Sequence, residues 1–175
     1  MQGIVQKLKE NKIGFILEGS DQSGKSTLCN KLSSLFSYPV FHYKYPSTYS
    51  DMYLEYSYKL EEKIPYIFDR NFISEMVYGE LFRNSIKIYE YLPDLIDRYK
   101  QEKYILILCH PFSFNFINRE EVFNKDQIFC ARQKYISLFS QITLPKILIN
   151  PFLSGSLQYV LNKSLYLSNL FYRGN

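Results

Sequence analysis

The chain has 175 residues, of which 46% are hydrophobic and 22% are charged. This length and composition predict one globular domain with a real core, and they exclude a disordered or low-complexity protein. The net charge of +4 suits anionic ligands such as nucleotides, but it is too small to predict nucleic-acid binding, which is not expected and not excluded.

The sequence predicts a cytoplasmic protein. Its three cysteines, Cys29, Cys109 and Cys130, are odd in number and stand in apolar surroundings, so we expect reduced, buried thiols. The start of the chain is polar and lacks the apolar core of a signal peptide. No apolar run approaches the roughly 18 residues of a transmembrane helix, so no membrane partner is expected.

Short apolar segments alternate with amphipathic ones along the whole chain. We expect strands at 13–17, 39–45, 65–69, 104–109 and 146–150. We expect helices at 25–36, 53–62, 72–82, 93–101, 126–139 and 155–165. Residues 112–125 have no clean period and read as a loop. The alternation predicts an α/β, three-layer fold with about five parallel strands and helices on both faces, in a single domain over 1–175.

The strongest motif lies between the first strand and the first of these helices. Gly19-Ser20-Asp21-Gln22-Ser23-Gly24-Lys25-Ser26 matches G-x-x-x-x-G-K-[ST], the Walker A pattern of P-loop proteins, at every fixed position. Glycines let the backbone N–H groups fold around phosphates, and the following helix adds its positive end. Lysine at this offset reaches the β- and γ-phosphates, and the serine hydroxyl binds Mg²⁺. The pattern predicts ATP and Mg²⁺ as ligands. The predicted ATP-binding residues are Gly19, Ser20, Gln22, Ser23, Gly24, Lys25, Ser26 and Thr27.

Two blocks resemble thymidylate kinases. Glu18 to Thr27 resembles their P-loop, in which an acidic residue at the position of Asp21 touches the sugar of the deoxynucleotide. Asp69-Arg70-Asn71-Phe72-Ile73-Ser74 resembles their Asp-Arg-x-x-x-Ser stretch. The resemblance implies a nucleoside monophosphate kinase fold in which Arg70 holds the acceptor phosphate and Asp69 supports Mg²⁺.

Weaker blocks agree with this resemblance. Tyr45-Pro46 resembles the aromatic-proline step of the nucleoside pocket, and 129–138 resembles the helix after the lid. Ser74 and Tyr78 are four apart on one helix face, so the resemblance implies that they too contact the acceptor. Residues 112–125 would be the lid, with Arg119 as its catalytic cation and Lys125 as the next candidate. The compact form is similar to bacteriophage members, and relatives of this type imply nucleotide partners and a possible homodimer.

The chain also departs from the thymidylate kinase pattern. No arginine precedes Ile67, and the region 47–63, which supplies the base-stacking aromatic residue in the family, is reduced. The prediction is therefore phosphoryl transfer from ATP to a deoxynucleoside monophosphate, with dTMP or a related pyrimidine nucleotide first.

Other functions stay open. The protein could instead be a deoxynucleoside kinase, with Glu18 or Asp21 as general base, or a kinase of modified bases in DNA. A P-loop NTPase without an acceptor is a further alternative. The only histidines, His42 and His110, are interpreted as packed or hydrogen-bonded residues.

Overall fold

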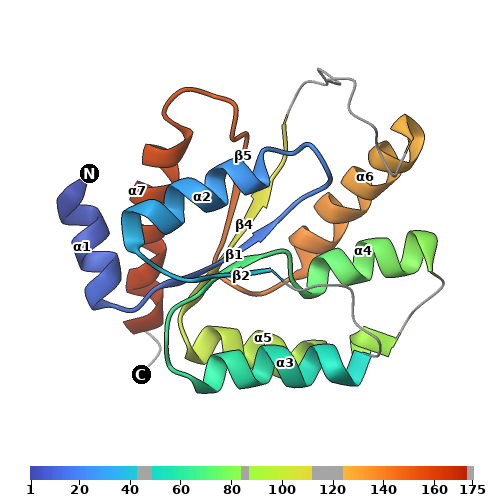
Figure 1. Ribbon diagram of the computed structural model, residues 1–175, viewed down its shortest axis with the longest axis horizontal. Helices are drawn as coiled ribbons and strands as arrows, with labels where there is room; N and C mark the ends of the chain where they lie inside the picture. The colour runs from blue at the N-terminus through green and yellow to red at the C-terminus, as the bar shows by residue number, and fades with distance from the viewer. Residues whose placement is uncertain (43–48, 84–86, 112–123, 173–175) are drawn as a thin grey trace.

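The computed structural model describes residues 1–42, 49–83, 87–111 and 124–172. Within these ranges five parallel strands form one sheet in the order β2-β3-β1-β4-β5 (Figure 1). The strands are β1 (Gly14–Glu18), β2 (Val40–His42), β3 (Ile67–Asp69), β4 (Tyr104–Cys109) and β5 (Lys146–Ile149). The central position of β1 places the loop that follows it in the middle of the carboxyl edge of the sheet.

Helices cover both faces of this sheet (Figure 1). On one face lie α1 (Gln2–Glu10), α2 (Lys25–Phe36) and α7 (Ser156–Ser168). On the other lie α3 (Tyr49–Glu61), α4 (Phe72–Phe82), α5 (Leu92–Gln101) and α6 (Lys125–Gln141). Short 3-10 turns, η1 (Lys87–Glu90) and η2 (Asn169–Tyr172), precede α5 and follow α7. The three-layer arrangement confirms the predicted fold class.

Alternation along the strands divides the core in two. Phe15 and Leu17 of β1 join the cluster under α1, α2 and α7, whereas Ile16 joins the cluster under α3 to α6. All five residues of β1 are buried, because a central parallel strand is covered on both faces. This explains why the strand reads as a continuous apolar run rather than as an alternating one.

The structure corrects several element predictions. Helix α1 was not expected, because only Val5 and Leu8 of its nine residues are buried and its sequence is largely polar. Helix α3 begins at Tyr49, four residues earlier than predicted, and Lys125 belongs to α6 rather than to the preceding loop. The prediction of three buried cysteines is wrong for Cys130, which lies exposed on α6. Within the described ranges every helix is too short or too polar to cross a lipid bilayer.

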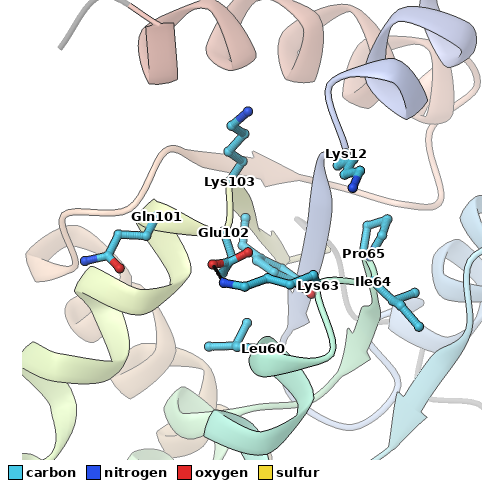
Figure 2. A pocket seen from close by; sticks show the side chains of 9 residues that line it. Lys12, Leu60, Lys63, Ile64, Pro65, Gln101, Glu102 and Lys103 are labelled. Atoms are coloured by element: carbon cyan, nitrogen blue, oxygen red, sulfur yellow. Dashed lines mark hydrogen bonds and ion pairs between the residues drawn. The ribbon is translucent and has the colours of Figure 1, made fainter. Parts of the chain in front are cut away.

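A hollow of about 220 Å³ opens at the amino edge of the sheet, opposite the phosphate-loop motif (Figure 2). Lys12, Lys63 and Lys103 line it, and the ammonium group of Lys63 pairs with Glu102. Each lysine follows the last turn of a helix and has a positive φ of 53° to 59°. Their charges offset the negative ends of α1, α3 and α5, so helix termination accounts for this cluster.

Candidate active site

The loop from Gly19 to Ser26 has a backbone that depends on its glycines. Gly19 has φ +146°, and a Cβ there would lie 2.5 Å from the carbonyl oxygen of Cys109. Gly24 has φ +80° and is the N-cap of α2, which begins at Lys25. The loop therefore packs closely on β4 and delivers the chain into a helix N-terminus, where backbone N–H groups are free to bind an anion.

The side chains of this loop divide into buried and exposed groups. The hydroxyl of Ser23 is buried and has no hydrogen-bond partner among the described residues. Ser26 and Thr27, in the first turn of α2, are exposed. An unpaired buried hydroxyl costs free energy, so a ligand oxygen that reached Ser23 would relieve that cost.

Lys25 and Asp69 form an ion pair at the carboxyl edge of the sheet. The ammonium nitrogen of Lys25 lies 3.0 Å from Asp69 Oδ1, and the two side chains are only 7% and 13% exposed. Nevertheless, Asp69 Oδ1 meets no donor in good hydrogen-bond geometry. The pair is therefore a charge contact that leaves acceptor capacity on the carboxylate.

His42 also reaches Asp69. Its Nδ1 lies 3.3 Å from Asp69 Oδ2, and its side chain is 54% exposed. The contact arises because His42 and Asp69 are register partners at the ends of β2 and β3. His42 was expected to be packed or hydrogen-bonded; the imidazole is half exposed and so is not packed in the core, but it has a polar partner in Asp69.

Arg70, the residue that follows β3, makes a second ion pair with the loop. Arg70 contacts the carboxylate of Asp21 through Nη2, and its guanidinium lies 5.1 Å from the ring centre of Tyr78. Arg70 has φ +71°, and its N–H bonds to the carbonyl of Leu17 at 3.0 Å. The backbone therefore turns sharply after Asp69, which sends consecutive side chains to two separate points of the loop.

Behind Arg70 lies the fully buried carboxylate of Glu18. Its Oε1 accepts hydrogen bonds from the backbone N–H groups of Asn71, at 2.9 Å, and Ser74, at 3.1 Å. Its Oε2 accepts one from the Ser74 hydroxyl, which also lies 2.7 Å from the hydroxyl of Tyr135. Glu18 thus ties the end of β1 to the start of α4.

Burial raises the pKa of Glu18 to about 7, although the hydrogen bonds from Ser74 and the charges of Arg70 and Lys25 act in the opposite direction. A carboxylate removed from water is destabilised relative to its neutral form, and the donors compensate only in part. Glu18 is completely buried, so it is unable to contact an acceptor hydroxyl as the general base considered above.

The structure brings most of the predicted site residues together. Lys25, Asp69, Asp21 and Arg70 are in direct contact as two pairs, and Tyr78 lies against Arg70. Ser74 lies one step further inside, with its hydroxyl engaged by Glu18 and Tyr135. The predicted residues Tyr45, Pro46 and Arg119, and the lid up to residue 123, lie outside the described residues.

The sequence offered only weak reasons to place Tyr135 and His42 at the site. Tyr135 is buried on α6, three residues after Arg132, which donates a hydrogen bond to the carbonyl of Pro111. His42 was recognisable only as a polar residue ending a strand that neighbours β3. Among the described residues no cluster of three or more His, Cys, Asp and Glu side chains could hold a metal ion.

No protein-family model matches the sequence, and no curated protein is significantly similar to it. Solved structures are similar in fold. The YorR protein of Bacillus subtilis, solved in complex with phosphorylated GDP, has a TM-score of 0.73 at 22% identity, over 93% of this chain and 99% of that one. Deoxyadenosine kinase from M. mycoides with bound dATP has a TM-score of 0.53 at 16% identity, over 86% and 97%. At these identities the likeness establishes architecture, and the chain has the three-layer α/β fold of P-loop kinases.

Proposed function

We propose that the protein is a nucleotide kinase that transfers the γ-phosphoryl group of ATP to a deoxynucleoside monophosphate. One observation carries the proposal. Asp69 and Arg70, adjacent at the end of β3, pair with Lys25 and Asp21 of the same loop. One loop and one strand end thus hold two cations, Lys25 and Arg70, side by side where ligands of parallel sheets bind. When the acceptor itself carries a phosphate, phosphoryl transfer is served by one cation on the donor phosphates and a second on the acceptor phosphate.

On the donor side, the backbone from Gly19 to Thr27 would bind the ATP phosphates. The tight turn at Gly19 and the start of α2 supply N–H groups, and the Ser23 hydroxyl would gain its missing partner. Lys25 would release Asp69 and contact the β- and γ-phosphates. Ser20, Gln22 and Gly24 complete the loop.

The residues present fit a magnesium ion held mainly by phosphates and water. Ser26 exposes a hydroxyl at the first turn of α2, and Asp69 Oδ1 has acceptor capacity left for a metal-bound water. When bound, Mg²⁺ neutralises charge on the β- and γ-phosphates. The same carboxylate would thus exchange Lys25 for the hydration shell of the ion.

On the acceptor side, Arg70 would bind the monophosphate through its guanidinium fork. Asp21, whose side chain is 40% exposed, would accept a hydrogen bond from the sugar, and Tyr78 would wall the site. Tyr45 and Pro46 remain predicted contacts of the nucleoside, and Arg119 remains the predicted lid cation. Positioning and charge stabilisation would do most of the catalytic work.

The first acceptor to test is dTMP. The acidic Asp21 within the loop supports it, because that feature is shared with thymidylate kinases, whereas the base itself is not fixed by any described contact. The similar structures contain phosphorylated GDP and dATP, which supports a nucleotide in the site.

A deoxynucleoside kinase is the second candidate. The observation in its favour is that Asp21 is partly exposed beside Arg70, where a carboxylate could take the proton of an acceptor hydroxyl. The phosphate acceptor remains preferred, because Arg70 supplies a fixed cation that a neutral nucleoside does not require.

An acceptor screen tests the proposal. Purified protein, Mg²⁺ and γ-labelled ATP are offered all deoxynucleosides, their monophosphates, modified pyrimidine forms and short DNA. We expect label on a deoxynucleoside monophosphate and a loss of at least about a hundredfold in Lys25→Ala. Lys31→Ala, at an exposed position of the same helix, is the matched control and should retain activity.

Each other pattern of labelling has its own meaning. Label on a nucleoside supports the second candidate, and label on DNA contradicts both. ATP hydrolysis without any labelled acceptor would contradict the kinase assignment and favour a P-loop NTPase.

A further inference from the structure

Four side chains form a continuous hydrogen-bond chain from the site into the core. Arg70 Nη1 lies 3.4 Å from the hydroxyl of Tyr135, which lies 2.7 Å from Ser74 Oγ. Ser74 Oγ in turn donates to Glu18 Oε2. Glu18, Ser74 and Tyr135 are at most 8% exposed, so water does not compete for these hydrogen bonds.

The two ends of this chain fix the direction of every hydroxyl. A guanidinium is a donor only, and an ionised carboxylate is an acceptor only. Ser74 therefore gives its single hydrogen to Glu18 and accepts from Tyr135. Tyr135 gives its hydrogen to Ser74, so its oxygen is the atom that faces Arg70. The buried negative charge thus orients an acceptor towards the inner side of the guanidinium.

Arg70 has a different partner on its outer side. Asp21 contacts Nη2 and is 40% exposed, whereas Tyr135 is reached through Nη1 and is 1% exposed. An arriving phosphate would compete with Asp21 for the outer side of the fork. The inner link to Tyr135 is not accessible to the phosphate and would persist through the exchange.

We propose that Glu18, Ser74 and Tyr135 hold the guanidinium of Arg70 in place for the acceptor phosphate, so that Tyr135 and Glu18 are positioning residues for phosphoryl transfer. This inference rests on the proposed function, because it assigns Arg70 to the acceptor. Ser74 then acts through Arg70 rather than by touching the substrate. These hydrogen bonds link the end of β1, helix α4 and helix α6. A shift of α6 would therefore move the partner of Arg70.

Tyr135→Phe is the sharpest test, because it removes one oxygen atom and keeps the ring. With the monophosphate that the screen labels fastest, at pH 8, we expect the acceptor KM to rise by about 5- to 10-fold. The KM for ATP should stay within about twofold, because among the described residues the hydrogen bonds of the Tyr135 hydroxyl go to Arg70 and Ser74 and not to the loop that would bind ATP. Tyr104→Phe is the matched control. It also removes a buried hydroxyl, one that binds the backbone N–H of Tyr66 at the far edge of the sheet, and it should leave both KM values unchanged.

A double-mutant cycle with Arg70→Lys separates positioning from general loss of stability. Lysine keeps the charge but lacks the second nitrogen that reaches Tyr135. If Tyr135 acts through Arg70, Tyr135→Phe should weaken calorimetric binding of the monophosphate in the wild-type background and have little further effect in Arg70→Lys. Glu18→Gln, whose amide must donate to Ser74 and so reverses the chain, should also raise the acceptor KM.

The outcomes separate this inference from the proposed function. If the wild-type protein labels no acceptor, the proposed function fails and the inference fails with it. If the wild type is active but Tyr135→Phe leaves the acceptor KM unchanged, the inference alone is overturned. An equal loss of binding in the wild-type and Arg70→Lys backgrounds would also overturn it.

Discussion

Lys25 and Asp69 face each other across 3.0 Å with nearly all of their side-chain surface buried. Each residue therefore neutralises a charge that the core alone would not tolerate. The pair links the first turn of α2 to the end of β3. Because both side chains are buried, the pair should contribute to the stability of the fold whatever the function of the site.

Replacement of Lys25 by methionine should destabilise the protein. The variant leaves Asp69 largely buried without its ammonium partner, and such losses cost about 3 kcal/mol. Urea unfolding measures the change in the free energy of unfolding. Asp69→Asn added to Lys25→Met should recover part of the loss, and exposed Lys31→Met should change little. A Lys25→Met variant as stable as the wild type would show that the pair has no such role.

Glu18 should make stability depend on pH. Its pKa is about 7 in the folded protein and 4.5 as the reference for the unfolded chain. Between these values the folded state binds more protons, so the contribution of Glu18 to the free energy of unfolding falls as the pH rises from 4.5 to 7. The fall is on the order of 3 kcal/mol and is complete above pH 7.

Glu18→Gln tests this dependence. Its stability relative to the wild type should improve from pH 4.5 to 7.5, as followed by urea unfolding across that range. Glu55→Gln, at an exposed position, serves as control, and its free energy of unfolding should change with pH in parallel with that of the wild type. Parallel curves for Glu18→Gln as well would mean that the buried carboxyl does not titrate in this window.

Gly19→Ala should abolish nucleotide binding. The added Cβ would meet the Cys109 carbonyl oxygen at 2.5 Å and the Ser23 hydroxyl at 2.7 Å, so the loop has to move. Gly155→Ala is the matched control, because Gly155 also has a positive φ, +78°, but open space around it. We expect a cost of about 1 kcal/mol at Gly155 without loss of nucleotide affinity. Equal ATP affinities for the two variants, measured by calorimetry, would contradict the close packing at Gly19.

Lys12→Gly should stabilise the protein. Lys12 has φ 53° after the end of α1, a conformation that costs a side chain about 1 kcal/mol and costs glycine little. The melting temperature should rise by roughly 2 °C, the gain being reduced by the greater freedom of glycine in the unfolded chain. Lys7→Gly, within α1, should lower it instead. A lower melting temperature for Lys12→Gly would show that the ammonium group of Lys12 stabilises the protein by more than its positive φ destabilises it.

The fold was predictable because the buried strands are short apolar runs. Strand β4, Tyr104–Cys109, has six buried residues and was recognised at its observed bounds. The phosphate-loop motif was equally visible, because all its residues are close together in the sequence. Its glycines are needed because Gly19 and Gly24 have positive φ angles. Helix α1 escaped notice because its sequence is largely polar, with only two buried residues in nine.

The interior of the site was not predictable. The contact of His42 with Asp69 depends on the register of two strands, and that of Ser74 with Tyr135 depends on how α4 packs on α6. Neither strand register nor helix packing can be read from the spacing of residues within one short segment. The resemblance implied that Ser74 contacts the acceptor, whereas the three-dimensional structure places its hydroxyl between Glu18 and Tyr135.

Both cations of the site are held by carboxylates of the protein, Lys25 by Asp69 and Arg70 by Asp21. A single chloride or sulfate ion would displace a carboxylate without offering it a new partner. A magnesium nucleotide would bring a divalent cation together with its phosphates, and Asp69, once released by Lys25, would have the hydration shell of that cation as its new partner. With the proposed magnesium nucleotide as ligand, we therefore expect inorganic anions to be poor competitors of the complete nucleotide.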